Sequence, residues 1–450
     1  MRGSRRSSCP SFAPVLRCGA TCATLFGALL STSIATPARA AQITDVADAA
    51  ETDDPIDVNI EVMFDLMRHS GLLTRENTQP PPDDPAGPPR TADVKELEYE
   101  RLRLRLRPRL EVGVFRDLAL FTEWPVILFD QQTTRFAEGT DATNSTIVRD
   151  LAPNATPVVD GWPETAGAGN TLQEIQNGTF GFPGKAYNDW GMAGDGSYQA
   201  YRAGLDNPSF GIRWSPLNNE RDETKPTVTL QTDYTAPFFQ QQNPTGDSLA
   251  DSAAPGPVPD GLHKFHFSAA MSKRTAIFDP YFLLEYTIPF VGNETPEVAG
   301  HQPRQFGGFL AGVEVVPYED KKLKQKFALE LQAGATYFSE GRDYSEISDL
   351  FKEMTYTDQF IRLGGRAGLK FKTFDIFFFN LQGVLNYDTE HFLTIEDFGR
   401  DLDDANDEID LDNPAERNVY YNPAIDTVGR RLRIEQSLHL GFLVHVGLTF

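Results

Sequence analysis

The sequence predicts an all-β protein, a transmembrane antiparallel up-and-down β-barrel of about twelve strands with long extracellular loops and short periplasmic turns. Three observations predict it. The chain ends in a long segment in which apolar and polar residues alternate, the connections between predicted strands alternate between long and short, and an export signal precedes them. Mean hydropathy is that of a soluble protein, which is compatible with a barrel because strands carry lipid-facing residues only at alternate positions.

The last strand shows the alternation most fully. From Phe450 back to Leu432 nearly every second residue is apolar, and the residues between them are mostly small, polar or charged. Period-2 alternation indicates a strand with one face in an apolar medium and the other in a polar one. The alternation continues for roughly twenty residues, whereas a tilted strand needs only about ten to cross a bilayer. We interpret 430–450 as the closing strand of the barrel.

Residues 1–40 resemble a cleavable export signal. Arginines precede an apolar stretch over 20–35, and Ala38-Arg39-Ala40 has the small-residue pattern of a cleavage site. All three cysteines lie inside this segment, so the mature chain offers no disulfide.

The charge balance excludes one class of partner. The whole chain carries −23, and 1–40 holds five arginines and no acid, so the remainder carries −28. Nucleic acid is therefore not an expected partner. No uninterrupted apolar segment of the mature chain is long enough for a spanning helix.

The first strands follow an acidic periplasmic linker at 41–55, and the barrel itself is expected over 56–450. Alternation is clear at 57–65, a Pro-rich interruption follows, and then Arg101–Arg107 alternates arginine with leucine. As a strand, this segment places every leucine on one face and every arginine on the other. The next strand is 118–129, and the Gly-, Asn- and Asp-rich segment 131–206 is expected to be one long loop.

The remaining strands and their connections complete the pattern. Further strands are predicted at 209–216, 227–235, 262–272, 276–289, 306–316, 326–338, 360–372 and 374–387. The long connections are 68–95, 131–206, 238–261, 291–304, 339–357 and 389–429, and short turns lie between them. An up-and-down barrel with long outer loops requires this alternation, and an even strand number leaves both termini on the periplasmic side.

If the apolar sets face lipid, the alternate sets face the lumen. The predicted pore-lining residues are Asp57, Glu61, Asp65, Arg101, Arg103, Arg105, Arg107, Arg213, Glu285, Glu314, Glu330, Arg362, Arg366, Lys370, Arg431, Arg433, Glu435 and His439. An arginine facing the bilayer midplane costs about 2–4 kcal/mol, so the arginines are expected inside. Their row either attracts anionic solutes or forms an internal salt-bridge ladder that stiffens the wall.

The sequence lacks several common motifs for catalysis and cofactor binding. The sequence holds no G-x-S-x-G elbow, no Walker loop and no H-E-x-x-H, and no histidine has the His-x-x-Asn-Gly context of outer-membrane phospholipases. We therefore expect no enzyme, no cofactor and no metal site built on these patterns. The acidic segment 401–412 is a candidate for a divalent cation, although runs of acids are usually only solvated.

Two resemblances narrow the class. The ending Leu443–Phe450 resembles the C-terminal signature of bacterial outer-membrane barrels, which implies recognition by the barrel-insertion machinery. The segment 207–237, a strand, a charged turn, a proline and a second strand, resembles the outer-membrane transporters grouped with meta-pathway phenol-degradation proteins. These resemblances imply a Gram-negative outer-membrane location and contact with membrane lipid and lipopolysaccharide.

The expected function is a porin-like channel or transporter that passes small solutes through a polar, arginine-lined lumen. The alternative is a closed structural or adhesive barrel whose lumen is filled by salt bridges, and an outer-membrane enzyme is a third, less favoured class. The sequence does not identify the solute.

Overall fold

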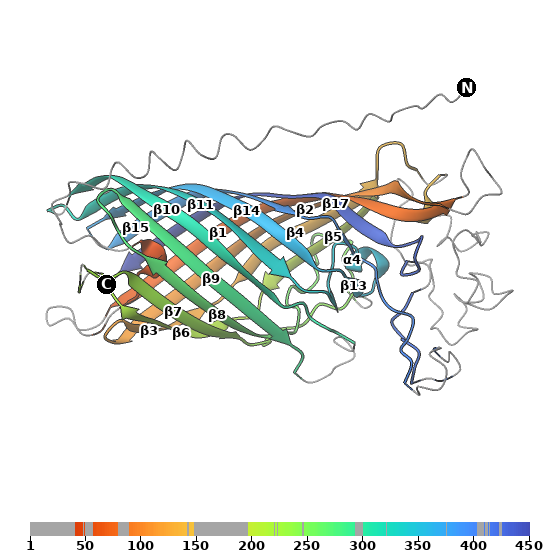
Figure 1. Cartoon of the computed structure of the whole chain (residues 1–450), viewed down its shortest axis with the longest axis horizontal. Helices are drawn as coiled ribbons and strands as arrows, with labels where there is room; N and C mark the ends of the chain where they lie inside the picture. The colour runs from red at the N-terminus through yellow and green to blue at the C-terminus, as the bar shows by residue number, and fades with distance from the viewer. Residues whose placement is uncertain are drawn as a thin grey trace, which may run out of the picture. The chain divides into compact units, whose positions relative to one another are not determined.

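Twelve strands close into an antiparallel barrel in the computed structural model (Figure 1). The structure describes residues 41–47, 49, 57–79, 90–141, 144–147 and 197–450, the last range with gaps at 220, 223, 245–246, 293–299, 321, 375, 403–408, 410–412, 414 and 423–424. The wall consists of β1 Val58–Gln79, β2 Arg90–Phe115, β3 Leu118–Glu123, β4 Val126–Phe136, β5 Ser197–Leu205, β6 Ser209–Leu217, β7 Thr227–Thr235, β8 His263–Ser272, β9 Phe278–Phe290, β10 Phe306–Asp320, β11 Gln325–Phe338, β14 Phe360–Thr373, β15 Phe377–Asp388 and β17 Leu432–Thr449. The predicted fold class is confirmed.

Two of the wall strands are interrupted. β3 and β4 both pair with β2 and are separated at Trp124-Pro125, and their partners β6 and β5 are separated by 206–208. Proline has no N–H to donate to a ladder, which explains why each interruption contains one, Pro125 and Pro208. The Asp206 amide donates to the Pro125 carbonyl at 2.9 Å, so the two interruptions lie side by side.

The barrel closes where the two ends of the chain meet. β1 pairs with β17 along nearly its whole length and with β2 on its other side. At the seam the Val58 amide donates to the Phe450 carbonyl at 2.9 Å, and the Phe450 amide donates back at 3.0 Å. The alternating last segment is therefore the closing strand, as predicted.

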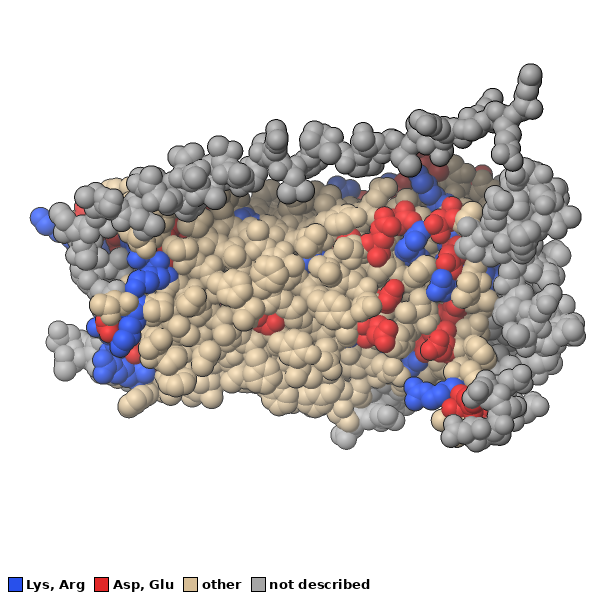
Figure 2. Space-filling view, viewed as in Figure 1, with Lys and Arg blue, Asp and Glu red and all other residues tan. Residues whose placement is uncertain are grey.

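An apolar belt surrounds the barrel. Leu440 and Phe442 of β17 point outward with 46% and 63% of their surface exposed, and Leu110 of β2 does so with 41%. In Figure 2 the middle of the visible face is almost free of charge, and charged side chains gather toward its two ends. Since closure pairs the backbone of every wall strand, this belt can contact lipid without exposing unpaired polar groups. The protein is thus an integral barrel of the bacterial outer membrane.

Two β-bulges near the outer end of the barrel change which side chains face the lumen. The β1–β17 register shifts between Ser70 and Leu72, where Gln436 adopts φ 52°, and the β1–β2 register shifts between Leu73 and Thr74. A bulge adds one residue to one strand and reverses which side chains face inward beyond it. Beyond these bulges Leu73, Leu432 and Ile434 are buried on the lumen side together with Arg75, whereas Arg431 and Arg433 lie on the outer face.

The first two strands are longer than predicted. The segment 68–95 was expected to be a long loop, but β1 continues to Gln79 and β2 begins at Arg90. Likewise β4 continues to Phe136 and β5 begins at Ser197, so the loop predicted at 131–206 is shorter at both ends. Above the lipid belt a strand no longer needs apolar residues on its outer face, and the sequence signal for it disappears.

The inner mouth contains the start of the described chain. Residues 41–47, which include the short 3-10 helix η1 (Gln42–Thr44), lie inside the barrel against β7 and β8. The Thr44 hydroxyl lies 2.8 Å from the Ser272 hydroxyl, and Thr229 donates to the Thr44 carbonyl at 2.8 Å. The Ala47 amide donates to Glu111 at 3.1 Å. The expectation of a periplasmic linker at 41–55 is therefore wrong for 41–47, which we call the inner segment.

The outer mouth is filled by an apolar cluster. Its fully buried members come from the wall strands and from the loops that fold between them: Leu73, Leu97, Tyr99, Ile147, Ile347, Leu350, Leu393, Ile425, Leu432 and Ile434. On the loop side, Ile347 and Leu350 come from the start of helix α4 (Ser348–Phe351), which lies between the short paired strands β12 (Gly341–Asp343) and β13 (Thr355–Thr357). The other loop members come from other connections. We call residues 341–357 the outer cap. A short strand, β16 (His391–Phe392), pairs with β17 beside it.

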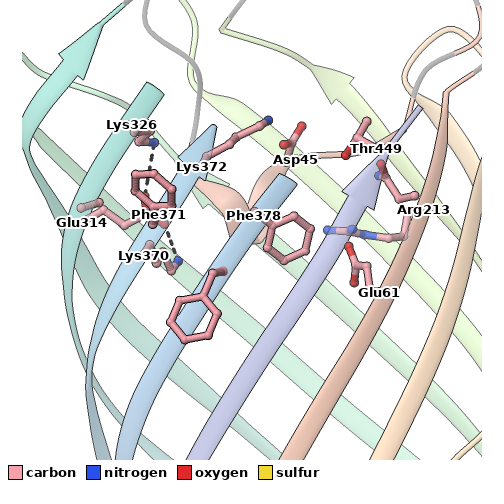
Figure 3. Close-up of a pocket in the computed structure, with 13 residues that line it drawn as sticks. Asp45, Glu61, Arg213, Glu314, Lys326, Lys370, Phe371, Lys372, Phe378 and Thr449 are labelled. Atoms are coloured by element: carbon pink, nitrogen blue, oxygen red, sulfur yellow. Dashed lines mark hydrogen bonds and ion pairs between the residues drawn. The ribbon is translucent and has the colours of Figure 1, made fainter. Parts of the chain in front are cut away.

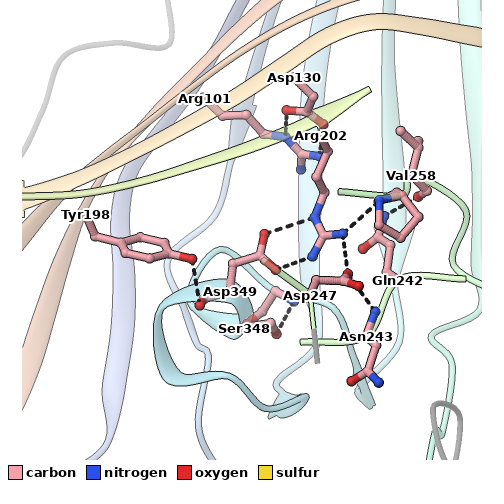
Figure 4. A network of polar contacts seen from close by, with 12 residues as sticks. Arg101, Asp130, Tyr198, Arg202, Gln242, Asn243, Asp247, Val258, Ser348 and Asp349 are labelled. Atoms are coloured by element: carbon pink, nitrogen blue, oxygen red, sulfur yellow. Dashed lines mark hydrogen bonds and ion pairs between the residues drawn. The ribbon is translucent and has the colours of Figure 1, made fainter. Parts of the chain in front are cut away.

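A buried arginine holds the outer cap to the wall (Figure 4). Arg202 of β5, 3% exposed, donates to Asp349 of α4 at 2.6 Å and to Asp247 at 2.9 Å. The Tyr198 hydroxyl donates to the Asp349 carbonyl at 2.9 Å. These contacts satisfy the charges that the cap buries.

Three expectations fall on residues outside the described set. They are the export signal at 1–40, most of the loop within 131–206, and most of the acidic segment 401–412. Among the described residues no helix has the length and apolar character to cross a membrane.

Candidate functional site

The lumen holds a cavity of about 540 Å³ directly above the inner segment, which contributes Ile43 to its lining. Strand alternation explains the lining, because every second residue of each wall strand points inward. Its cations are Arg105, Arg107, Arg109, Arg213, Arg366 and Lys370, and its acids are Glu61, Asp65, Glu123, Glu285 and Glu330. The formal balance of these side chains is one positive charge.

One wall of the lumen is the arginine row of β2. Its members are Arg101, Arg103, Arg105, Arg107 and Arg109. Carboxylates on this side of the lumen pair with most of them. Arg101 contacts Asp130 directly, Arg105 lies 2.6 Å from Asp65, and Arg109 lies 2.7 Å from Glu111. The row is thus largely a salt-bridge ladder that holds positive charge along the lumen.

Two members of the row are paired less closely. Arg103 lies 3.6 Å from Asp130, which already contacts Arg101, and Arg107 lies 3.7 Å from Glu123. Ion pairs at these distances are weaker and leave donors of the guanidinium unused. The row therefore keeps excess positive charge near Arg103 and Arg107.

Another part of the wall carries a second network around Lys370 of β14. Its ammonium group donates to Glu314 at 2.6 Å and to Glu330 at 2.8 Å, and the Tyr281 hydroxyl donates to Glu330 at 2.5 Å. Gln382 donates to the second Glu330 oxygen at 2.6 Å. Both acids are buried, and these donors compensate their charge.

A smaller pocket lies at the inner end of this wall (Figure 3). Asp45 of the inner segment, Arg213, Lys326, Lys370 and Lys372 line it, together with aromatic and acidic residues. Arg213 also donates to the Ile43 carbonyl at 3.0 Å. The inner segment therefore lies among cations at the periplasmic end of the lumen.

Toward the outer end, two histidines and an aspartate approach one another. His69 of β1 stacks on His439 of β17 with ring centroids 3.9 Å apart, and His439 Nε2 lies 2.9 Å from Asp388. Arg362 donates to both Asp388 oxygens, at 2.6 and 2.9 Å.

This group has the residue types of a metal site or a catalytic triad, but its geometry fits neither well. A metal ion would compete with Arg362, which already occupies both oxygens of Asp388. Ser437 contacts His69 at 2.9 Å, yet Asp388 contacts Ser437 and His439 rather than His69. The nucleophile–base–acid order of a hydrolase is therefore not present at this group.

The structure places the predicted pore-lining residues at three levels. Nine line the central cavity: Glu61, Asp65, Arg105, Arg107, Arg213, Glu285, Glu330, Arg366 and Lys370. Glu314 lies at the inner pocket, and Arg101, Arg103, Arg362 and His439 lie toward the outer end. Asp57 immediately precedes β1 at the periplasmic rim, where its carbonyl accepts from Gly113.

The predicted inward position is wrong for Arg431, Arg433 and Glu435. Their neighbours Leu432 and Ile434 are fully buried in the outer cluster, so these three side chains lie on the other face. Arg431 lies 2.8 Å from Glu76, and Arg433 contacts Asp93 at the outer rim. The bulge at Gln436 causes the reversal, since strict alternation from Phe450 would have brought them inside.

Sequence reasoning missed several residues that build the site. Asp130, Glu111 and Asp388 neutralise inward arginines, and Thr44 and Asp45 belong to a segment expected outside the barrel. Asp130 and Asp388 each lie one residue beyond a predicted strand, 118–129 and 374–387. Continuing the alternation of the second strand places Asp388 with the inward set, whereas a bulge between Ile127 and Asp130 hides the inward position of Asp130.

No protein-family model and no curated protein matches this sequence. Solved structures of bacterial outer-membrane barrels overlap most of the chain. An outer membrane channel from Pseudomonas putida F1 is 9% identical with a TM-score of 0.36, covering 86% of this chain and 95% of its own. A Pseudomonas aeruginosa FadL homologue is 8% identical with a TM-score of 0.32, covering 88% of this chain and 90% of its own.

An anion-selective porin from Comamonas acidovorans also overlaps, at 9% identity and a TM-score of 0.20, covering 87% of this chain and 100% of its own. These likenesses are low in identity and in TM-score, and no residue of this chain takes a role from them.

Proposed function

We propose that this protein is an outer-membrane channel that passes small polar or charged solutes through its lumen. The observation that carries the proposal is the central cavity, whose lining of arginine, lysine, carboxylate and amide side chains favours hydrated solutes. The inner segment contributes Ile43 to the lining of this cavity, and the outer cap packs in the outer mouth. Under this proposal, both elements must move before the channel conducts.

The inner segment has the properties of a removable closure. It is held by polar contacts such as Thr44 to Ser272 and Ala47 to Glu111. Hydrogen bonds of this kind contribute about 0.5–1.5 kcal/mol each, so releasing a few of them needs little free energy. We therefore place the periplasmic gate at this segment.

The arginine row gives the channel a mild preference for anions. Most of its positive charge is compensated by the ladder, and the excess near Arg103 and Arg107 remains. The resemblance of 207–237 to transporters grouped with phenol-degradation proteins supports a transporter and adds phenol-derived solutes to those worth testing.

Further partners belong to the same proposal. We assign Phe450 and the alternate residues before it to recognition by the barrel-insertion machinery. Outward ion pairs at the outer rim, Arg68 with Glu100 and Arg135 with Glu98, offer polar groups to lipopolysaccharide.

A closed structural or adhesive barrel is the second candidate. The fully buried outer cluster and the ladder favour it, because both stabilise a filled lumen. The two functions differ in whether any condition opens the lumen.

Planar-bilayer conductance and liposome uptake of a neutral sugar test the proposal. The intact protein is compared with a variant that lacks residues 41–47 and keeps its export signal and barrel. We expect rare openings from the intact protein and a sustained, mildly anion-selective conductance from the deletion. Absence of conductance and of sugar uptake for both proteins, each shown to be inserted and folded, favours the closed barrel.

A further inference from the structure

The cavity contains an arginine without a counterion. Arg366 of β14 points into the cavity, and more than a third of its surface is exposed there. Its neighbours across the ladders are Gln332 and Val384, neither of which carries charge. Among the residues the structure describes, no carboxylate lies within ion-pair distance of Arg366. A guanidinium placed in this way keeps its donors for a ligand.

Arg107 faces the same cavity with little compensation. Its nearest carboxylate oxygen, on Glu123, is 3.7 Å away, one of its terminal nitrogens contacts the Met63 sulfur, and its Nε is buried without a hydrogen-bond partner. Arg107 and Arg366 both line this cavity, so their charges face the same enclosed volume. Two like charges around one cavity repel each other, and an anion between them removes this repulsion.

Apolar and polar side chains both lie between the two arginines along the wall. The strands between them are β15, β17 and β1, and their inward residues include Val384, Leu443, Met63 and Met67, beside amides such as Gln382. The two arginines thus bracket a mixed surface whose apolar part is formed by these four side chains. Thioether side chains adapt to flat apolar groups of different shape.

Most acids of the cavity are already engaged. Asp65 pairs with Arg105, Glu330 with Lys370, and Glu61 lies 3.2 Å from His445. Glu285 of β9 has no ion pair among the described residues, and it lies on another part of the wall from Arg366. Near Arg107 and Arg366 a cationic ligand would have to displace the partners of these acids, whereas an anionic ligand meets Arg366 without displacing one.

We propose that the cavity binds a small organic carboxylate with an apolar body, its carboxylate between Arg107 and Arg366 and its body on the Met63, Met67 and Leu443 surface. This assignment rests on the proposed channel and names its substrate class. A volume of about 540 Å³ falls within the range of about 300–1,000 Å³ usual for small-molecule sites. Planar guanidinium groups suit a carboxylate better than a spherical ion because they can donate two parallel hydrogen bonds to it.

Calorimetric titration of the purified, detergent-solubilised full-length barrel tests the site with three probes of one shape: benzoate, benzyl alcohol and benzylamine. Benzoate is expected to bind at least about tenfold more tightly than benzyl alcohol, since charge-assisted hydrogen bonds are the stronger ones. Benzylamine is expected not to bind. Equal affinities for benzoate and benzyl alcohol overturn the proposal.

Matched variants locate the site. Arg366→Gln and Arg107→Gln are each expected to weaken benzoate binding about tenfold and to leave benzyl alcohol unchanged. Arg68→Gln, which removes a guanidinium from the outside of the wall, is expected to leave both unchanged. Heat-modifiable gel migration verifies that each variant is a closed barrel. Unchanged benzoate binding in folded Arg366→Gln overturns the assignment, as does an equal loss in Arg68→Gln.

The experiments distinguish an error in the proposed carboxylate site from an error in the proposed channel function. Neutral-sugar uptake by the deletion lacking 41–47, combined with no benzoate binding to the intact protein, overturns the carboxylate site and supports the channel. Benzoate binding by a barrel that conducts nothing, even without 41–47, supports the site and overturns the channel.

Discussion

Arg202 and Asp349 form a buried two-point ion pair that joins the wall to the outer cap, with Nη2–Oδ1 at 2.6 Å and Nε–Oδ2 at 3.3 Å. Both residues are 3% exposed. The pair connects residues far apart in the chain, one on β5 and the other on α4. Its strength therefore sets how tightly the outer mouth is closed.

Replacing Arg202 with glutamine is expected to loosen the outer cap while leaving the barrel closed. Removing one partner of a buried pair costs about 3–5 kcal/mol, because the other charge stays buried without compensation. Hydrogen exchange over 341–357 measures this, and the exchange rate is expected to rise strongly there and not in β14 or β15. The double variant Arg202→Gln, Asp349→Asn restores part of the protection if the uncompensated charge is the cause. Unchanged protection in the single variant contradicts the role of this pair.

A disulfide between positions 44 and 272 is expected to lock the inner segment. The Thr44 and Ser272 hydroxyl oxygens are 2.8 Å apart, and cysteine side chains can bridge from such positions with small adjustments. All three natural cysteines lie within 1–22, so the new pair has no competitor in protein prepared without residues 1–40. Oxidised Thr44→Cys, Ser272→Cys protein is expected to be silent in bilayers, and reductant to restore openings. Thr44→Cys alone is the control, and neither oxidation nor reductant is expected to change its conductance.

The architecture was predictable from sequence because it depends on alternation, which the lipid belt imposes. Outward Leu440 and Phe442 and inward Arg101 and Arg105 follow from period 2 alone. Beyond the belt the outer face is free to be polar, so the extensions of β1 and β2 carry no comparable signal. The reversal at Gln436 was also hidden, since glutamine has no special preference for a positive φ.

The sequence predicted which residue types face the lumen better than it predicted which of them form ion pairs. The inward position of Arg366 follows from its strand, but its lack of a counterion depends on which residues lie across three neighbouring strands. The sequence places the inner segment in a linker because it belongs to the acidic stretch 41–55 between the export signal and the first strand. Its burial depends on side chains of β2, β7 and β8, which no local pattern connects to it.

The bulge at Gln436 gives a prediction about stability. Gln436 has φ 52°, a region that costs a non-glycine residue roughly 1–2 kcal/mol and that β-branched residues avoid. Gln436→Val is expected to lower the free energy of unfolding by about 1–2 kcal/mol, and Gln436→Gly to leave it nearly unchanged. Urea unfolding of the barrel in lipid vesicles measures both. Leu438→Val, in regular strand, is the control, and equal losses in both valine variants contradict the assignment of strain to position 436.

Acid is expected to weaken the loops at the outer mouth. Burial lowers the pKa of His301, against the opposing effect of Asp343 and Asp260, and burial also lowers the pKa of His391. A histidine whose pKa is depressed in the closed state stabilises that state above the ordinary value of about 6.5 and loses this contribution as pH falls below it. Limited proteolysis of the outer loops is therefore expected to be faster at about pH 5.5 than at about pH 7.5. His301→Asn, His391→Asn should reduce this difference, and a pH response that both substitutions leave intact assigns it to other groups.

Phe442 provides a test of the membrane belt itself. Its side chain is 63% exposed on the outer face of β17, midway along the apolar part of that strand. Phe442→Arg places a guanidinium against hydrocarbon, which costs about 2–4 kcal/mol near the bilayer midplane and much less near the interfaces. Folding yield into phospholipid vesicles is expected to fall sharply, while folding in detergent micelles, where water reaches the side chain, is affected less. Val428→Arg, at an exposed position in the outer loops, is the control and should fold equally well in both. Normal folding of Phe442→Arg into vesicles would place this face of β17 outside the lipid.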